Sequence, residues 1–79
     1  MKIELKLYAS LASHMPEKTG RNLYEMEVRE GTTIHDIIDQ LKVPRPGIKL
    51  IFLNGVHANG DEILREGDRV GIFPAVAGG

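Results

Sequence analysis

The chain has no cysteine among its 79 residues. It therefore cannot form a disulfide, use a cysteine nucleophile, or hold zinc or an iron–sulfur cluster through thiolates. Its three histidines, His14, His35 and His57, are scattered and show no i, i+4 pairing on one helix. The carboxylates do not form a recognisable acid–base pair either. We therefore expect neither a metal site nor a pair of catalytic carboxylates in this chain.

An excess of charge of either sign is also lacking. Ten Lys and Arg residues stand against eleven Asp and Glu residues, which gives a formal charge of -1. Domains of this size that bind nucleic acid usually carry a basic face, so nucleic acid is not an expected partner. A long apolar run is missing as well, because residues 1–7 carry charges at alternate positions, unlike a signal peptide or a membrane span. We therefore expect a cytoplasmic protein that does not enter a membrane.

The residues that are present suffice for one small folded domain. Apolar residues make up 42% of the sequence. That fraction is enough for a single core, although the length is near the lower limit for unaided folding. We predict a folded domain over residues 1–74 and a flexible, reactive tail over residues 75–79.

Two segments in the first part of the chain alternate between apolar and polar residues. This period of two predicts a strand over residues 2–8 and a second strand over residues 24–29. Between them, Ser10 precedes a predicted short helix over residues 11–15, which must end by Pro16, and a polar loop follows. The expected core positions of the two strands are Ile3, Leu5, Leu7, Tyr24, Met26 and Val28.

The clearest helix signal begins after Gly31. Thr32 or Thr33 can cap the helix, and Asp36 would lie in its first turn, opposite the exposed amide groups. Apolar residues then recur at i, i+3, i+4 and i+7, which predicts an amphipathic helix lying on a sheet. These apolar residues are Ile34, Ile37, Ile38 and Leu41.

The last part of the sequence predicts strands and turns. Residues 48–53 form a dense apolar run, which we interpret as a buried strand. Asn54-Gly55 is a strong signal for a tight turn, so residues 56–58 should return as a short strand. A final strand over residues 69–73 should direct Val70 and Ile72 to the core. One helix on a mixed sheet of four or five strands is an α+β arrangement, and its element order is that of the ubiquitin-like β-grasp fold.

Gly78 and Gly79 end the sequence with a backbone carboxylate that no side chain obstructs. Such a terminus suits insertion into the active site of another protein. A carboxylate is a poor electrophile and needs activation, most simply as a mixed anhydride with adenylate. The sequence has no phosphate-binding loop of the Walker type, so a partner enzyme would have to supply the ATP chemistry.

The same alternation predicts a docking patch beside this tail. If the apolar residues of the first and last strands face the core, Tyr8 and Phe73 face away from it. The first and last strands of a β-grasp sheet are adjacent and parallel, so these two rings should meet at the same end. Aromatic residues are favoured anchors at interfaces. His57, in the predicted hairpin, is a further candidate for this patch.

Four segments carry a resemblance to a known family. They are Leu7-Tyr8-Ala9-Ser10-Leu11, Leu53-Asn54-Gly55, Glu66-Gly67-Asp68-Arg69-Val70 and the ending Phe73-Pro74-Ala75-Val76-Ala77-Gly78-Gly79. With them the chain resembles the small, sulfur-carrying subunit of molybdopterin synthase. The wider group of ubiquitin-like sulfur carriers includes the carrier of the thiamine pathway, which shares the fold and the Gly-Gly ending.

The resemblance implies a mechanism in which the chain alone is catalytically inert. An E1-like enzyme would use ATP to adenylate Gly79, with Gly78 giving access to the reactive site. A persulfide donor would then displace AMP and leave a thiocarboxylate. The large synthase subunit, in an expected heterotetramer, would receive the tail and pass the sulfur to a pterin precursor of the molybdenum or tungsten cofactor. The docking positions that the resemblance implies are Tyr8, His57 and Phe73, and we add Pro74 and Val76 of the ending as further docking candidates.

The sequence departs from the family pattern at two places. Ala12-Ser13 stands where members often have Arg-Glu, and Ala75 stands where they commonly have a second proline. Other readings of the chain are a sulfur carrier for thiamine, cysteine or another product, a ubiquitin-like modifier joined through Gly79 to lysine, and a β-grasp domain that only binds.

Overall fold

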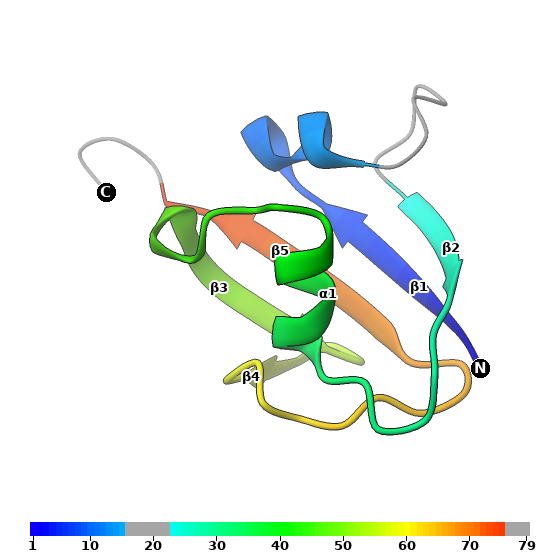
Figure 1. Ribbon diagram of the computed structural model, residues 1–79. Helices are drawn as coiled ribbons and strands as arrows, with labels where there is room; N and C mark the ends of the chain where they lie inside the picture. The colour runs from blue at the N-terminus through cyan, green and yellow to red at the C-terminus, as the bar shows by residue number, and fades with distance from the viewer. Residues whose placement is uncertain (16–22, 76–79) are drawn as a thin grey trace.

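The structure, a computed structural model, describes residues 1–15 and 23–75. Its elements in chain order are β1 (Lys2–Leu7), the 3₁₀ helix η1 (Ala9–His14), β2 (Leu23–Glu27), α1 (Ile34–Gln40), the 3₁₀ helix η2 (Arg45–Gly47), β3 (Ile48–Leu53), β4 (Val56–Ala58) and β5 (Arg69–Pro74). The strands form one sheet in the order β2-β1-β5-β3-β4. Helix α1 lies across one face of this sheet (Figure 1). The predicted α+β fold of the β-grasp type is therefore confirmed.

Strands β1 and β5 form the centre of the sheet and run parallel, whereas the other strand pairs are antiparallel. The alternation predicted for both strands is confirmed, because Leu5 and Leu7 of β1 and Ile72 of β5 are fully buried. The buried apolar residues that pack into one core are Ile3, Leu5, Leu7, Leu11, Met15, Met26, Val28, Ile34, Ile37, Ile38, Val43, Ile51, Ala58, Leu64, Val70 and Ile72.

Helix α1 begins with a reciprocal cap that decides between the two candidate threonines. The Asp36 backbone N–H donates to Thr33 Oγ1 at 3.2 Å, and the Thr33 N–H donates to Asp36 Oδ2 at 3.0 Å. This capping box satisfies two backbone donors that have no partner within the helix. The three isoleucines of the predicted stripe are fully buried against the sheet, and Leu41 is the partly exposed C-cap residue.

The short helix expected over residues 11–15 differs in position and type. It is a 3₁₀ helix that already includes Ala9 and Ser10 and ends at His14. Leu11 is the only buried residue within it. Met15 follows with an extended backbone, as expected for a residue that precedes a proline.

The expectation of a buried strand over residues 48–53 was wrong in its burial. The strand is present as β3, but of its residues only Ile51 is buried, and Leu50 is 37% exposed. The side chains that alternate away from α1 lie on a sheet face that no described element covers. The turn after β3 is confirmed, with positive φ angles of 53° at Asn54 and 81° at Gly55 that match a two-residue hairpin turn.

The same turn is bound to the start of β5. Asn54 Nδ2 donates to Asp68 Oδ1 at 3.0 Å, and the Arg69 N–H donates to Asn54 Oδ1 at 2.9 Å. The Asn54 N–H in turn donates to the Arg69 carbonyl at 2.8 Å. These hydrogen bonds join the Asn-Gly turn to the Gly-Asp-Arg segment, and they fix the position at which β5 begins in the sheet.

Candidate docking face

The Tyr8 and Phe73 rings are stacked on the sheet face opposite α1. Their centroids are 4.0 Å apart and the ring planes differ by 7°. Tyr8 follows β1 directly, and its N–H donates to the Ile72 carbonyl of the neighbouring strand at 3.0 Å. The parallel pairing of Leu7 with Ile72 therefore brings the next residue of each strand to the same height. The predicted meeting of Tyr8 and Phe73 is confirmed.

Phe52 joins this pair to His57, and sequence reasoning missed it. The Phe52 ring is nearly perpendicular to that of Phe73, with centroids 5.7 Å apart, and it meets the His57 ring edge-on at 6.0 Å. Phe52 and His57 are partners across the β3–β4 hairpin. We call Tyr8, Phe52, His57 and Phe73 the aromatic cluster. The four consecutive apolar residues at the end of β3, residues 50–53, hid the outward direction of Phe52, although its position opposite the predicted hairpin stub could have revealed it.

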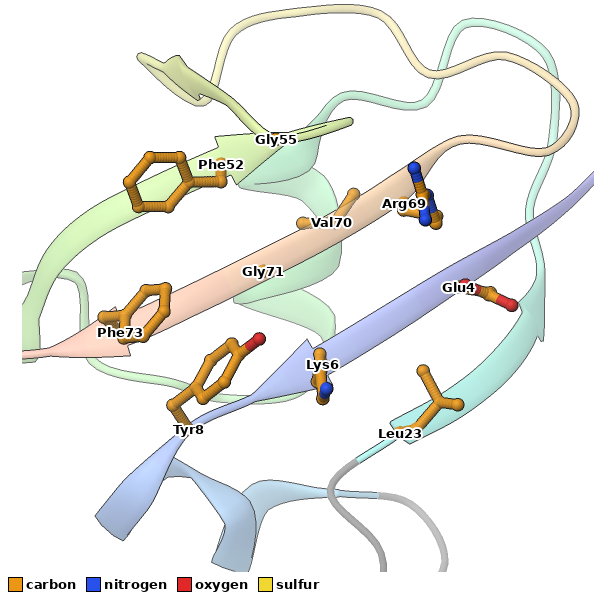
Figure 2. A pocket seen from close by; sticks show the side chains of 10 residues that line it. All are labelled: Glu4, Lys6, Tyr8, Leu23, Phe52, Gly55, Arg69, Val70, Gly71 and Phe73. Atoms are coloured by element: carbon orange, nitrogen blue, oxygen red, sulfur yellow. The ribbon is translucent and has the colours of Figure 1, made fainter.

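A shallow groove of about 450 Å³ runs over this face beside the cluster (Figure 2). Gly71 forms its floor, because this residue lies between Lys6 of β1 and Phe52 of β3 and contributes no side chain. A Cβ atom at Gly71 would lie 3.4 Å from Tyr8 Cε2. The missing side chain therefore keeps the groove open between the rings.

The two ends of the groove differ in chemistry. Figure 2 shows Phe73 and Tyr8 at one end and the charged side chains of Glu4 and Arg69 at the other. Lys6 lies between them, with its Nζ 5.5 Å from the Tyr8 ring centroid, a distance at which the cation and the ring attract each other. The aromatic end is the one at which β5 finishes. The face can thus bind an apolar group next to the point where the chain leaves the sheet.

The other predicted site residues lie partly outside the described part of the chain. Pro74 is described, as the last, partly exposed residue of β5. Val76, Gly78 and Gly79 lie outside the described residues. The His35 ring is half-buried against Gly60 and leaves no room for a side chain there. The described residues contain no group of three side chains that could hold a metal ion, and their helices include none long and apolar enough to cross a membrane.

Shifted pKa values occur away from the aromatic cluster. Hydrogen bonds from Arg45 hold the pKa of Asp39 below its ordinary value, and the same contact raises the pKa of Arg45. The backbone N–H groups of Asn59 and Gly60 donate to the Glu62 carboxylate and lower its pKa. Each of these groups is stabilised in its charged form. These charged groups make structural contacts, and their pKa shifts do not prepare them to exchange a proton.

A family model described as Mut7-C ubiquitin matches residues 1–78. This chain belongs to that family. None of the curated proteins matches the chain.

Solved structures with the same fold come from archaea, a bacterium and a trypanosome. A Pyrococcus furiosus protein that carries the name molybdopterin converting factor, subunit 1, is 27% identical, with a TM-score of 0.70 over 95% of this chain and 98% of that one. Small archaeal modifier protein 1 of Haloferax volcanii is 26% identical, with a TM-score of 0.70 and the same coverage. A complex of subunits 1 and 2 of the Helicobacter pylori molybdopterin-converting factor contains a chain that is 20% identical, with a TM-score of 0.60, which shows the fold alone.

Proposed function

We propose that the chain is a sulfur carrier whose Gly79 carboxylate is activated by an E1-like enzyme and converted to a thiocarboxylate. The sulfur would then pass to a pterin precursor in the synthesis of the molybdenum or tungsten cofactor. The large subunit of the synthase would bind the aromatic cluster and accept the tail. The chain itself would supply a docking face and a reactive end and no catalytic group.

The chemistry proposed for Gly79 balances with two external reactants. Its carboxylate oxygen attacks the α-phosphorus of ATP, and pyrophosphate leaves to give an acyl adenylate. The outer sulfur of a partner's persulfide then attacks the carbonyl carbon, and AMP leaves. A second thiolate on the partner attacks the inner sulfur, breaks the S–S bond, and is itself oxidised to a disulfide. The thiocarboxylate that leaves is the sulfur donor for the next step.

One observation carries this proposal: the aromatic cluster lies at the end of the same strand that continues into the Phe-Pro-x-Val-x-Gly-Gly ending. Phe73, one member of the stack, precedes Gly79 by few residues. A partner that binds the cluster therefore holds the carboxylate close to its own active site. Docking on a rigid surface lowers the entropy cost of bringing the reactive group to its target. The likeness to a molybdopterin converting factor subunit supports the choice of pathway.

The direct test is to incubate the chain with an E1-like enzyme, ATP and a persulfide donor and to measure its intact mass. We expect a gain equal to the exchange of one oxygen atom for sulfur, located at Gly79 by fragmentation. A chain without Gly79 should fold normally and gain nothing. Adding a large synthase subunit and the cyclic pterin precursor should then return the mass to its starting value. An unchanged mass in the presence of a competent activating enzyme would refute sulfur carriage.

A second candidate is a ubiquitin-like modifier, and the 26% identity to a protein named small archaeal modifier protein 1 favours it. In that case the activated Gly79 would be attacked by a lysine amine of a target protein, with formation of an isopeptide bond. The same reaction, run with lysine-rich acceptor protein in place of the pterin precursor, separates the two. Adducts linked through Gly79 would identify a modifier, whereas a free thiocarboxylate that reacts only with the pterin precursor would identify the carrier.

A further inference from the structure

The last described residue of the chain is hydrogen-bonded to the body of the domain. The Ala75 N–H donates to the Gly47 carbonyl of η2 at 2.8 Å. Pro74, one residue earlier, is the register partner of Ile48 in β3, but as a proline it has no N–H to donate. Ala75 therefore supplies the first backbone donor beyond β5. Figure 1 shows the green coil of η2 next to the end of this strand.

The segment that accepts this hydrogen bond is itself held in place. Pro44 and Pro46 flank Arg45 and restrict the backbone φ angles of η2. The Gly47 N–H donates to the Pro44 carbonyl at 2.9 Å. The two prolines and this hydrogen bond restrict the directions in which the Gly47 carbonyl can point.

An ion pair ties η2 to the end of α1. Arg45 Nε donates to Asp39 Oδ1 at 3.1 Å, and Arg45 Nη2 donates to Asp39 Oδ2 at 2.8 Å. Two parallel hydrogen bonds between a planar guanidinium and a carboxylate fix orientation as well as distance. The contacts therefore form a continuous path from α1 through Asp39, Arg45 and Gly47 to Ala75.

We infer that this path is a latch that sets the direction in which the chain leaves the domain, with Asp39 and Arg45 acting as positioning residues. The inference rests on the proposed function, since a fixed direction of the chain after β5 matters only if the terminus must reach a partner's active site. With the exit held at Ala75, only four residues extend to the carboxylate of Gly79. They span at most about 14 Å. An activating partner that binds the aromatic cluster would therefore have to place its nucleotide within that reach of Ala75.

Amide hydrogen exchange measured by NMR tests the latch without any partner. In the wild-type chain the Ala75 amide should exchange about fivefold more slowly than in an unstructured peptide, as one exposed hydrogen bond of ordinary strength predicts. Arg45→Gln should remove most of that protection and leave the Ile72 amide unchanged. The matched control is Arg65→Gln, the same change in the loop before β5, which should have no effect at Ala75. An Ala75 amide that exchanges at the unstructured rate in the wild-type chain would overturn the inference.

Kinetics of thiocarboxylate formation supply the second readout. Arg45→Gln should lower kcat about threefold and leave KM for the carrier unchanged, because docking through the aromatic cluster is intact and only the path of the tail is looser. The exchanged pair Asp39→Arg with Arg45→Asp should restore both kcat and Ala75 protection. An unchanged kcat in Arg45→Gln would show that the latch does not position the terminus. If the wild-type chain is not thiocarboxylated at all, the proposed function fails, while the exchange measurement still decides whether the latch exists.

Discussion

The two faces of the sheet use different kinds of side chain. The face beneath α1 is aliphatic, with Ile, Leu and Val side chains that are almost fully buried. The open face carries three of the chain's aromatic rings, those of Tyr8, Phe52 and Phe73, together with the side-chain-free position Gly71. Tyr24 packs against the core, but only as a partly buried residue. The fold therefore depends on aliphatic packing, and the aromatic side chains are available for binding.

Ile72 and Phe73 are adjacent on β5 but lie on opposite faces of the sheet, so substitutions at these two positions give the sharpest comparison of the faces. Ile72→Ala should reduce the free energy of unfolding by about 2–5 kcal/mol, because it opens a cavity among fully buried aliphatic side chains. For a small domain that loss is a large part of the total stability. Chemical denaturation measures it, and Ile72→Val should lose only about 0.5–1.5 kcal/mol. Equal losses for the two variants would contradict tight packing at this position.

The neighbouring change, Phe73→Ala, should affect binding more than folding. Loss of the stack with Tyr8 should reduce the free energy of unfolding by about 1 kcal/mol. Affinity for the activating enzyme or the large subunit, measured by calorimetry, should fall at least about tenfold, since a central aromatic anchor is removed. If affinity is unchanged while stability falls as far as in Ile72→Ala, the contrast between the faces is wrong.

Filling the groove should weaken binding without damaging the fold. Gly71→Val places a branched side chain beside Tyr8 on the open face, where the backbone allows it and β propensity favours it. We expect a change in stability within about 1 kcal/mol and an affinity for the partner about threefold to tenfold lower. Gly71→Ala, with a single methyl group, should give a smaller loss of affinity in the same direction. An affinity that rises with side-chain size would show that the partner does not enter the groove.

The smallest effect concerns the ion pair on the α1 side of the sheet. Arg45 lowers the pKa of Asp39 below its ordinary value of 3.8 in the folded state. The pair's contribution to stability is therefore fully present above that ordinary pKa and is lost as the pH falls through the lower, folded-state value. Near neutral pH the stability should not vary with pH through this pair. Comparing the unfolding free energy of wild-type and Asp39→Asn chains from neutral to strongly acidic pH should show a difference that shrinks only in acid.

The elements with local patterns were predictable from the sequence. The alternation of Ile3, Leu5 and Leu7, the helical spacing of the isoleucines and the Asn-Gly turn each specify a conformation through neighbours in the chain. The burial of β3 was not predictable in this way, because its last four residues are all apolar and show no alternation that would tell which of them turn outward. The contact of Ala75 with Gly47 joins segments far apart in the sequence, and a backbone hydrogen bond leaves no signature in residue type.

The residues of the candidate site likewise differ in how far the sequence alone predicted them. Parity and parallel pairing were enough to bring Tyr8 and Phe73 together. The predicted Asn-Gly turn was enough to place Phe52 opposite His57 in the hairpin, although this was missed, whereas its register with β5 is fixed only when the sheet assembles.

The parallel pairing of β1 with β5 also has a consequence for biosynthesis. The first strand of the sheet in chain order, β1, pairs with the last one, β5. Until residue 74 has been translated, Leu5 and Leu7 lack the neighbouring strand that completes their burial. The apolar edge of β1 therefore lacks this neighbour while the segment between β1 and β5 is being translated. Pairing between segments so far apart in the sequence slows folding relative to local contacts, and the sheet becomes continuous only when β5 inserts between β1 and β3.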